Sequence, residues 1–368
     1  MIIFLLIFLG LYGSINFYFF FKAKNFLHFS GKAEFIIIIL MIFLILAPMI
    51  IRLAEKLDLE TVARLIAYFG YLWMAFIFLF FFVNISLDLT RFALHFFFKA
   101  FENSQMKTVF FVLAILLSLS FVLYGYIDAQ KIRIKQMEIT SEKLSPNLQK
   151  IRIIQISDLH IGLIIRDKRL KSILEKVNNL KPDIVVSTGD LLDGELDDVH
   201  IEAEQFAEIK PKYGKYAVTG NHEYYAGIEK ALAFTEKAGF EILRNGSKKV
   251  AGINIIGLED ETGRKLGLSS TNSSNSIPEE KSNEFILLLK HQPTIEREQN
   301  FDLQLSGHTH GGQIFPFAFF VRIFFPINSG YNVRNNKSIY VSNGAGTWGP
   351  PVRFLAPPEI TVIDLIKK

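Results

Sequence analysis

The sequence predicts two parts of different character, an amino-terminal bundle of four membrane-spanning helices followed by a mixed α/β domain. Two observations lead to this fold class. Apolar residues make up 50% of the 368 residues, with 36 Phe among them, and most gather in long runs before residue 130. From about residue 139 onward, short apolar runs alternate with charged segments of helical periodicity, which is typical of a chain that alternates strands and helices.

Four runs in the first part, residues 1–130, are long and apolar enough to cross a bilayer, which takes roughly 20 residues as a helix. They cover residues 2–21, 35–51, 65–87 and 107–127, and charged clusters separate them. The first run lacks the basic start and the small-residue cleavage site of a signal peptide, and four such runs in succession are unusual for a soluble core. The sequence therefore predicts a multi-pass protein of the cell membrane with both termini on one side.

The charges leave open which side of the membrane carries the second part. Equal numbers of basic residues flank the two ends of the predicted spans, so the positive-inside rule favours neither orientation. The chain has no cysteine, so no disulfide points to an oxidising compartment. The net charge of +4 argues against a dedicated nucleic-acid surface, and we expect no nucleic acid among the partners.

The second part is expected to fold as one α/β unit over residues 150–368, joined to the spans by a linker at 131–149. Eight short apolar runs are typical of strands: residues 151–157, 183–188, 216–220, 253–258, 285–290, 301–306, 338–343 and 360–365. Segments of helical periodicity lie between them, at residues 166–179, 202–209 and 227–238. A polar, low-complexity segment at residues 269–276 is expected to be a loop without chemistry.

Residues that can bind metals or transfer protons follow five of the predicted strands. The motifs are DLH at 158–160, GDLLD at 189–193, GNHE at 220–223, KHQP at 290–293 and GHTHGGQ at 307–313. In open α/β folds, ligands bind in the crevice beyond the carboxyl ends of the strands, so motifs far apart in sequence are expected to meet there. The His-x-His pair alone is weak evidence for a metal, but the other motifs supply its partners.

The ordered set of five motifs resembles the calcineurin-like metallophosphoesterase superfamily, in particular a membrane-associated branch whose last motif continues into Gly-Gly-Gln. The resemblance covers about residues 150–368 and implies a four-layer α/β/β/α sandwich. It also implies two divalent metal ions, and imidazole and carboxylate ligands favour Mn, Zn or Fe. The implied activity is hydrolysis of a phosphoester by a hydroxide that bridges the two metals.

The resemblance also assigns roles to individual residues. The metal ligands would be Asp158, His160 and His310 for one ion, Asn221, His291 and His308 for the other, and Asp190 as the bridge between them. His222 resembles the general acid that protonates the leaving oxygen, and Asp193 the carboxylate that orients it. Taken singly, an Asp or Asn is explained as a helix cap and His291 as a core histidine, but such separate explanations do not produce the family order.

Two features after the last metal motif bear on the substrate. The aromatic segment at residues 314–327 carries one charge, Arg322, and is too short to span a bilayer. It is expected to lie at a membrane interface or line an apolar pocket, or else to form a buried helix that packs on the sheet or against the four spans. Arg353, in a glycine-rich stretch, is a candidate for binding phosphate. We therefore expect a phosphoester substrate, with a lipid-linked one favoured, and the lipid bilayer as a partner.

Two alternatives to this function stay open at the level of sequence. The first is a nucleotide-lipid pyrophosphatase of the UDP-2,3-diacylglucosamine hydrolase type, which shares the phosphorus chemistry and hence the motifs. The second is a non-catalytic membrane sensor or scaffold that keeps the metals for structure. Because one fold hosts many functions, fold similarity does not choose among them.

Overall fold

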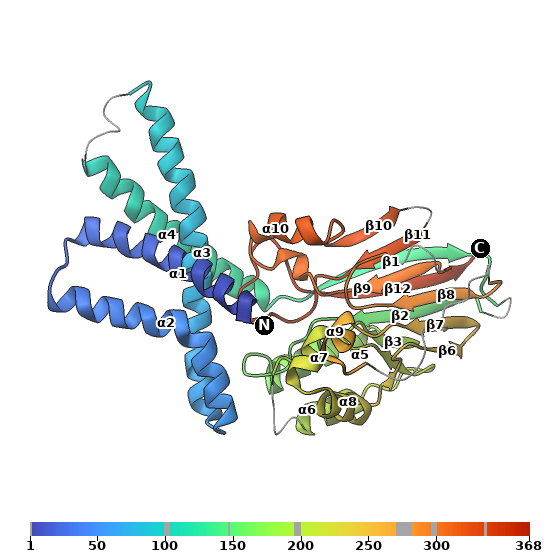
Figure 1. Cartoon of the computed structure of the whole chain (residues 1–368). Helices are drawn as coiled ribbons and strands as arrows, with labels where there is room; N and C mark the ends of the chain where they lie inside the picture. Colours follow the sequence, from blue (N-terminus) through green and yellow to red (C-terminus); the bar gives the residue numbers. More distant parts are fainter. Residues whose placement is uncertain are drawn as a thin grey trace. The chain divides into compact units, whose positions relative to one another are not determined.

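The chain, described here by a computed structural model, divides into two compact units (Figure 1). The structure describes residues 2–98, 104–145, 148–194, 200–269, 282–295, 300–334 and 337–368. The first unit comprises Met1–Ile127 and Gly349–Phe354, and the second comprises Asp128–Trp348 and Leu355–Lys368. Most of the low-complexity segment predicted at 269–276 lies outside the described residues.

Four long helices form most of the first unit: α1 (Ile2–Leu27), α2 (Lys32–Lys56), α3 (Glu60–His95) and α4 (Ser104–Ala129). Each is long and apolar enough to cross a membrane. Aromatic rings fill the space between α1 and α3, where Phe19 contacts Trp73, Phe76 and Phe80 at centroid distances of 5.0–5.8 Å. Many other large apolar side chains of these helices stay exposed, as expected for surfaces that face lipid rather than water.

A short segment from late in the sequence packs against α4 within this unit. The backbone N of Arg353 donates to the backbone O of Gly125, at 2.9 Å, and the ring of Phe354 stacks on Phe121 with centroids 4.8 Å apart. A Cβ added at Gly125 would lie 2.6 Å from Cγ1 of Val352. The glycine in α4 therefore permits this close approach.

Two six-stranded sheets form the centre of the second unit (Figure 1). The first sheet has the order β1-β12-β2-β3-β4-β5, with β1 (Arg133–Ser141), β12 (Glu359–Lys367), β2 (Lys150–Ile156), β3 (Ile184–Ser187), β4 (Lys215–Ala217) and β5 (Glu241–Ile242). The second has the order β10-β11-β9-β8-β7-β6, with β10 (Gly330–Arg334), β11 (Lys337–Val341), β9 (Leu303–Ser306), β8 (Phe285–Leu289), β7 (Ile253–Gly257) and β6 (Gly246–Val250).

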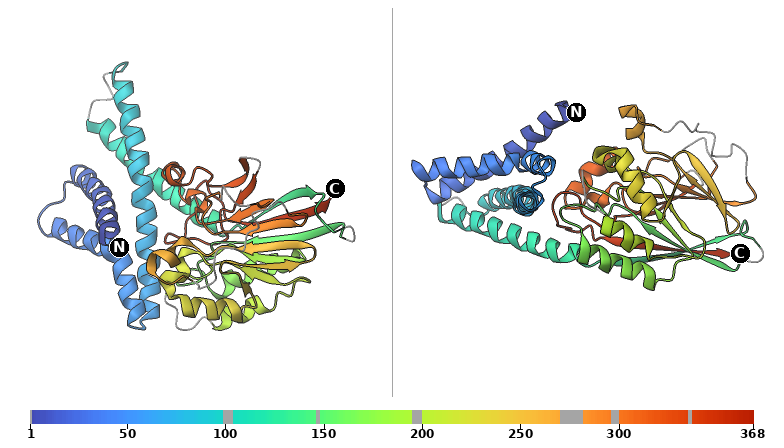
Figure 2. Two further views of the ribbon diagram at one scale, coloured as in Figure 1. Left: turned by 45° about the vertical axis from the view of Figure 1, so that its right-hand side comes forward. Right: turned by 90° about the horizontal axis from the view of Figure 1, so that it is seen from below.

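The helices of this unit are short, and most of them follow strands of the first sheet. They are α5 (Asp167–Asn179), α6 (His200–Ala207), α7 (Asn221–Ala226), α8 (Ile228–Lys237), α9 (Glu261–Leu266), the 3-10 turn η2 (His310–Gly312) and α10 (Phe317–Phe324). In α5, Leu170, Ile173 and Val177 are buried at the spacing of one helical face. The second unit is thus an α/β sandwich in which α5, α6 and α8 lie along the first sheet (Figure 2).

Alternating residues of each buried strand serve two separate cores. Ile151 and Ile153 of β2 point toward the second sheet and pack with residues such as Leu287 and Leu305. Ile154 and Ile156 of the same strand belong to the cluster that includes the helices α5, α6 and α8. Side chains of a strand alternate between its two faces, so a strand that is covered on both faces consists of apolar residues throughout. The predicted strands were identified by these short apolar runs. The predicted fold class is confirmed.

The predicted linker at residues 131–149 contains strand β1, which pairs in parallel with β12 from Arg133↔Glu359 to Ser141↔Lys367. The strand carries Arg133, Lys135 and Glu138 and none of its residues is buried. It lies at the edge of the sheet, where charged side chains are common because only one neighbour pairs with the strand. The connection between the two units is therefore shorter than the sequence indicated.

Candidate metal centre

The strands of both sheets bring the five motifs to one place. Asp158 and His160 follow β2, Asp190 follows β3, and Asn221 begins α7 after β4. These three strands are neighbours and parallel, so their carboxyl ends lie at the same edge of the first sheet. In the second sheet, His291 follows β8, and His308 and His310 follow the parallel neighbour β9. The geometry therefore matches the crevice position expected from the strand ends.

Left-handed backbone conformations occur at five of the predicted ligands. The φ angles are 52° at Asp158, 51° at His160, 54° at Asp190, 71° at His308 and 50° at His310. Such angles are uncommon for residues with a Cβ, and they cluster where a protein holds side chains for function. Each turn directs a side chain back toward the strand ends instead of continuing the strand.

Two glycines of the motifs lie so close to neighbouring residues that no side chain would fit at their positions. A Cβ at Gly307 would lie 1.9 Å from Oγ of Ser157, and one at Gly220 would lie 2.2 Å from Oδ1 of Asp190. No such contact is tolerated, so a larger residue would push the loops apart. Gly307 thus allows the His-x-His loop to lie against the end of β2, and Gly220 allows the GNHE loop to lie against Asp190.

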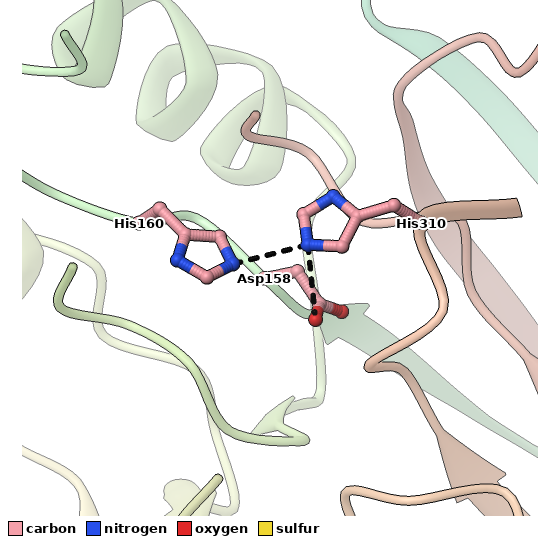
Figure 3. A group of neighbouring side chains, drawn as sticks. All are labelled: Asp158, His160 and His310. Atoms are coloured by element: carbon pink, nitrogen blue, oxygen red, sulfur yellow. Dashed lines mark hydrogen bonds and ion pairs between the residues drawn. The ribbon is translucent and has the colours of Figure 1, made fainter. Parts of the chain in front are cut away.

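The first group of side chains consists of Asp158, His160 and His310 (Figure 3). Nε2 of His160 lies 3.0 Å from Nε2 of His310, which in turn lies 3.6 Å from Oδ1 of Asp158. All three residues are buried. A buried carboxylate beside imidazole nitrogens that face each other is stabilised when a cation binds among them.

A second group of side chains consists of Asp190, His291, His308 and Asn221. Nε2 of His291 lies 3.1 Å from Oδ2 of Asp190 and 3.2 Å from Oδ1 of Asn221, and Nδ1 of His308 lies 3.2 Å from the same nitrogen. Nδ1 of His291 faces the backbone O of Thr188 at 2.8 Å. Burial and the neighbouring His291 lower the pKa of His308 to about 4, so His308 is neutral at pH 7, as a metal ligand must be.

Asp190 lies between the two groups. Its Oδ2 is 3.7 Å from Nε2 of His160 in the first group and 3.1 Å from Nε2 of His291 in the second. Its Oδ1 accepts a hydrogen bond from the backbone N of His222, at 2.9 Å. This position fits a carboxylate shared by two cations, and the donor set of carboxylates, imidazoles and one amide oxygen fits two divalent metal ions.

His222 and Asp193 lie together beside the first group. Oδ1 of Asp193 is 3.1 Å from Nδ1 of His222 and 3.3 Å from Nδ1 of His160. Burial disfavours the protonated form of His222, but the charge of Asp190 and the hydrogen bond to Asp193 raise its pKa to about 9. Burial likewise opposes the ionisation of Asp193, and its hydrogen bonds with the two imidazoles lower its pKa nonetheless. Asp193 therefore orients both the predicted acid and a predicted metal ligand.

Glu223 has a role that the sequence analysis missed, although the residue is part of the GNHE motif. Its buried carboxylate accepts hydrogen bonds from the backbone N of Gly220, at 2.7 Å, of Asp190, at 2.9 Å, and of Leu191, at 2.7 Å. It thereby fastens the loop after β3 to the loop after β4. The sequence signal for this role is its place as the third residue of α7, where a glutamate side chain can accept from the backbone N of the residue before the helix.

The glutamine of GHTHGGQ, Gln313, holds a neighbouring segment instead of joining the two groups. Its side-chain amide pairs with the backbone of Trp348, donating to O at 2.8 Å and accepting from N at 3.0 Å. Two half-exposed aromatic rings contact the ring of His222. The ring centroid of Trp348 lies 5.9 Å from that of His222, and the ring centroid of Tyr225 lies 5.5 Å from it. Aromatic side chains therefore border the predicted acid.

Arg353 belongs to the first unit, where its side chain is fully buried. The second unit brings the other nine predicted site residues together, whereas the role of Arg353 in binding phosphate stays a prediction. This prediction rests only on the charge of Arg353 and on the glycine-rich stretch in which it stands.

The part of the chain that holds this site resembles known proteins. Residues 151–312 match the family model of calcineurin-like phosphoesterases. The chain is 37% identical over 248 residues to an uncharacterized metallophosphoesterase of Aquifex aeolicus, covering 66% of this chain and 95% of that protein. It is 35% identical over 270 residues to one of Campylobacter jejuni, covering 72% and 71%. A zebrafish (Danio rerio) protein named as a transmembrane protein with a metallophosphoesterase domain is 34% identical over 274 residues, covering 69% and 62%.

Proposed function

The chain belongs to the calcineurin-like phosphoesterase family, and on this premise we propose that it is a membrane-anchored phosphoesterase that works with two divalent metal ions. The position of Asp190 between the two ligand groups is the observation that carries the proposal. A site for a single structural cation has no need of a carboxylate placed between two sets of imidazoles.

The ligand sets that we propose follow the two groups. One ion would be held by Asp158, His160 and His310, the other by Asn221, His291 and His308, and both by Asp190. When bound, the two metals would supply a nucleophile that forms at neutral pH and would neutralise charge on the phosphoryl oxygens. Mn, Zn and Fe all suit this donor set, in which no thiolate takes part.

The side chains around the metals would then position the phosphoester and move the proton. Nδ1 of His222 faces Asp193, which leaves Nε2 as the nitrogen that donates a proton to the leaving oxygen. The raised pKa of His222 supports its role as an acid, and cations bound nearby would bring this pKa down toward neutrality. Asp193 would keep the ring in the orientation and tautomer that this transfer needs.

We propose a lipid-linked phosphoester as the substrate. Four helices of this chain are apolar enough to cross a membrane, and an enzyme held at a bilayer meets a lipid substrate at a high effective concentration. A soluble substrate gains nothing from such an anchor.

The experiment that tests the function compares two carboxylate variants of the full-length protein in detergent. Asp190→Asn is expected to lose at least one metal per chain and nearly all turnover of p-nitrophenyl phosphate and bis-p-nitrophenyl phosphate. Glu229→Asn, at an exposed position on α8, is the matched control and should keep both. Metal content is measured by elemental analysis. Two tightly bound metals without turnover of any phosphoester in the unmodified protein would instead establish a sensor or scaffold.

A further inference from the structure

Helix α10 exposes an apolar surface that the phosphoesterase chemistry does not use. The exposed fractions are 56% for Phe319, 45% for Phe320, 72% for Ile323 and 77% for Phe324, and none of the eight helical residues is buried. Helix α10 is therefore not buried within the second unit. Water-soluble surfaces seldom gather large apolar side chains in this way, and such a patch indicates an interaction site.

The opposite side of α10 is fastened to the GHTHGGQ loop. Gly312 has φ 84°, and a Cβ there would lie 2.4 Å from Cα of Ala318, so the helix backbone rests directly on the loop. Beyond the helix, Oγ1 of Thr309 donates to the backbone O of Asn328, at 2.7 Å. The ring of Phe325 contacts the ring of His308 at 5.0 Å. Any surface that binds α10 is therefore coupled to two predicted metal ligands, His308 and His310.

The chain itself connects the second unit to a membrane by a short link. The last residue of α4 is Ala129 and the first of β1 is Arg133, so residues 130–132 alone connect a helix apolar enough to span a bilayer to the first strand of the second unit. Fully extended, these residues reach only roughly 10 Å. The bilayer that these helices can cross is therefore an apolar partner available to the second unit.

The charge of the segment agrees with a lipid surface. Arg322 is the one charged residue of α10, and its Nε donates to Oδ1 of Asn328 at 3.2 Å. Short helices rich in Phe and Ile bury their apolar side chains about 5–10 Å into the boundary between headgroups and acyl chains. We propose that α10 inserts Phe319, Phe320, Ile323 and Phe324 into the bilayer that holds the four long helices, and that this contact presents the GHTHGGQ loop to membrane lipids.

The first test measures insertion without relying on activity. Because the chain contains no cysteine, Phe320→Cys or Phe324→Cys can be labelled with bimane in the full-length protein and reconstituted into phosphatidylcholine nanodiscs. Lipids that carry a nitroxide near the headgroup should quench both labels, and lipids with the nitroxide near the methyl end should quench them less, because insertion is shallow.

Lys249→Cys is the control for this measurement. Lys249 is exposed on β6, the edge strand opposite to β10 in the second sheet, and its label should not be quenched by either lipid. Labels at 320 and 324 that remain unquenched overturn the proposal. In that case, a blue-shifted emission indicates that protein covers α10, either the long helices or a second copy, and an unshifted emission indicates that water does.

The second test rests on the proposed function and connects insertion to catalysis. The variant combines Phe319→Ser, Phe320→Ser, Ile323→Ser and Phe324→Ser. It keeps Phe325, because that ring contacts His308. It should hydrolyse phosphatidic acid in phosphatidylcholine vesicles at least about tenfold more slowly, since the local concentration of the lipid is lost, while its turnover of p-nitrophenyl phosphate stays the same. Equal losses on both substrates in a variant of unchanged melting temperature contradict the coupling. If the unmodified protein hydrolyses neither substrate, the proposed function fails, while the quenching result still decides insertion.

Discussion

At the scale of single residues, the grouping of the proposed metal ligands was predictable because each stands in a motif that follows a strand. Asp190 and His291 are 101 residues apart in the sequence, yet the strand order brings Oδ2 of Asp190 to 3.1 Å from Nε2 of His291. Glu223 was not predictable in the same way. Its carboxylate accepts from backbone N–H groups of the loop after β3. A local sequence pattern does not indicate which loop a side chain will contact.

Glu223→Gln should destabilise the fold and weaken metal binding. A glutamine presents an NH2 group where the native carboxylate accepts from Gly220, Asp190 and Leu191, so at least one buried N–H loses its acceptor. Such a loss costs about 1–3 kcal/mol of the free energy of unfolding. Thermal denaturation and metal content report the effect, with the exposed Glu229→Gln as control. An unchanged melting temperature for Glu223→Gln would show that Asp190 is positioned by other contacts.

His222→Ala should affect substrates according to their leaving groups. An alkyl phosphoester needs a proton on its leaving oxygen and should be hydrolysed about 10²–10⁴-fold more slowly, the range of general acid catalysis. A p-nitrophenyl ester releases a stable phenolate and should lose much less. Metal content should stay unchanged, because His222 is not among the proposed ligands. Comparable losses on the two esters would argue that His222 serves binding or structure instead of proton transfer.

At the scale of elements, the sequence predicted eight of the strands found in the described part of the chain and missed four, and the four are the edges of the two sheets. The missed strands are β1, β5, β6 and β10, and none of their residues is buried. A central strand is covered on both faces and therefore forms an apolar run, whereas an edge strand pairs on one side and tolerates charges such as those of β6, GSKKV. Pairing with a neighbour stabilises these strands, and pairing is not visible in local composition.

Gly125→Leu should detach the segment Gly349–Phe354 from α4. The new side chain would begin 2.6 Å from Val352 and 3.1 Å from the backbone O of Arg353, so the segment has to move, at a cost of about 1–3 kcal/mol in unfolding free energy. The matched control is Gly10→Leu in α1, where an added Cβ meets nothing within 4 Å. Thermal denaturation and limited proteolysis near residue 350 distinguish the two variants. Equal stability of both would mean that the segment adapts without cost.

At the scale of the whole molecule, the end of the chain is part of the centre of its second unit. Strand β12 lies between β1 and β2, and its buried Asp364 binds side chains of both neighbours. Arg152 donates to it at 2.8 and 3.0 Å, Lys150 lies 2.8 Å away, and Gln136 donates at 2.9 Å. The sequence predicted β12 from its apolar residues, but the charged partners of Asp364 lie more than 200 positions away and were not predictable.

Asp364→Asn should remove a contribution to the free energy of unfolding that is present at neutral pH and lost in acid. Hydrogen bonds from Arg152 lower the pKa of Asp364 to about 2, against the opposing effect of burial. Because the pKa is lower in the folded state, the contribution is complete above about pH 4 and is lost as the pH falls toward 2. Its size is about 2 kcal/mol or less, since Arg152 and Lys150 are partly exposed to solvent. Melting temperatures of the two proteins should differ at pH 7 and converge near pH 2. A difference that is the same at both pH values would assign the effect to packing.

The place where the second unit begins can be tested by two fragments that differ only by strand β1. A fragment of residues 131–368 keeps β1 paired with β12, whereas a fragment of residues 142–368 leaves β12 as an edge. All but the last two residues of β12 are buried, and the strand includes Ile360, Val362 and Ile363, so its uncovered edge would be apolar and prone to pair with another chain. We expect the longer fragment to bind metal and stay monomeric, and the shorter one to melt at a lower temperature and aggregate. Both fragments leave Gly349–Phe354 without α4, so this loss does not contribute to the difference between them. Equal melting temperatures and metal contents would show that β1 is only a linker, as the sequence alone indicated.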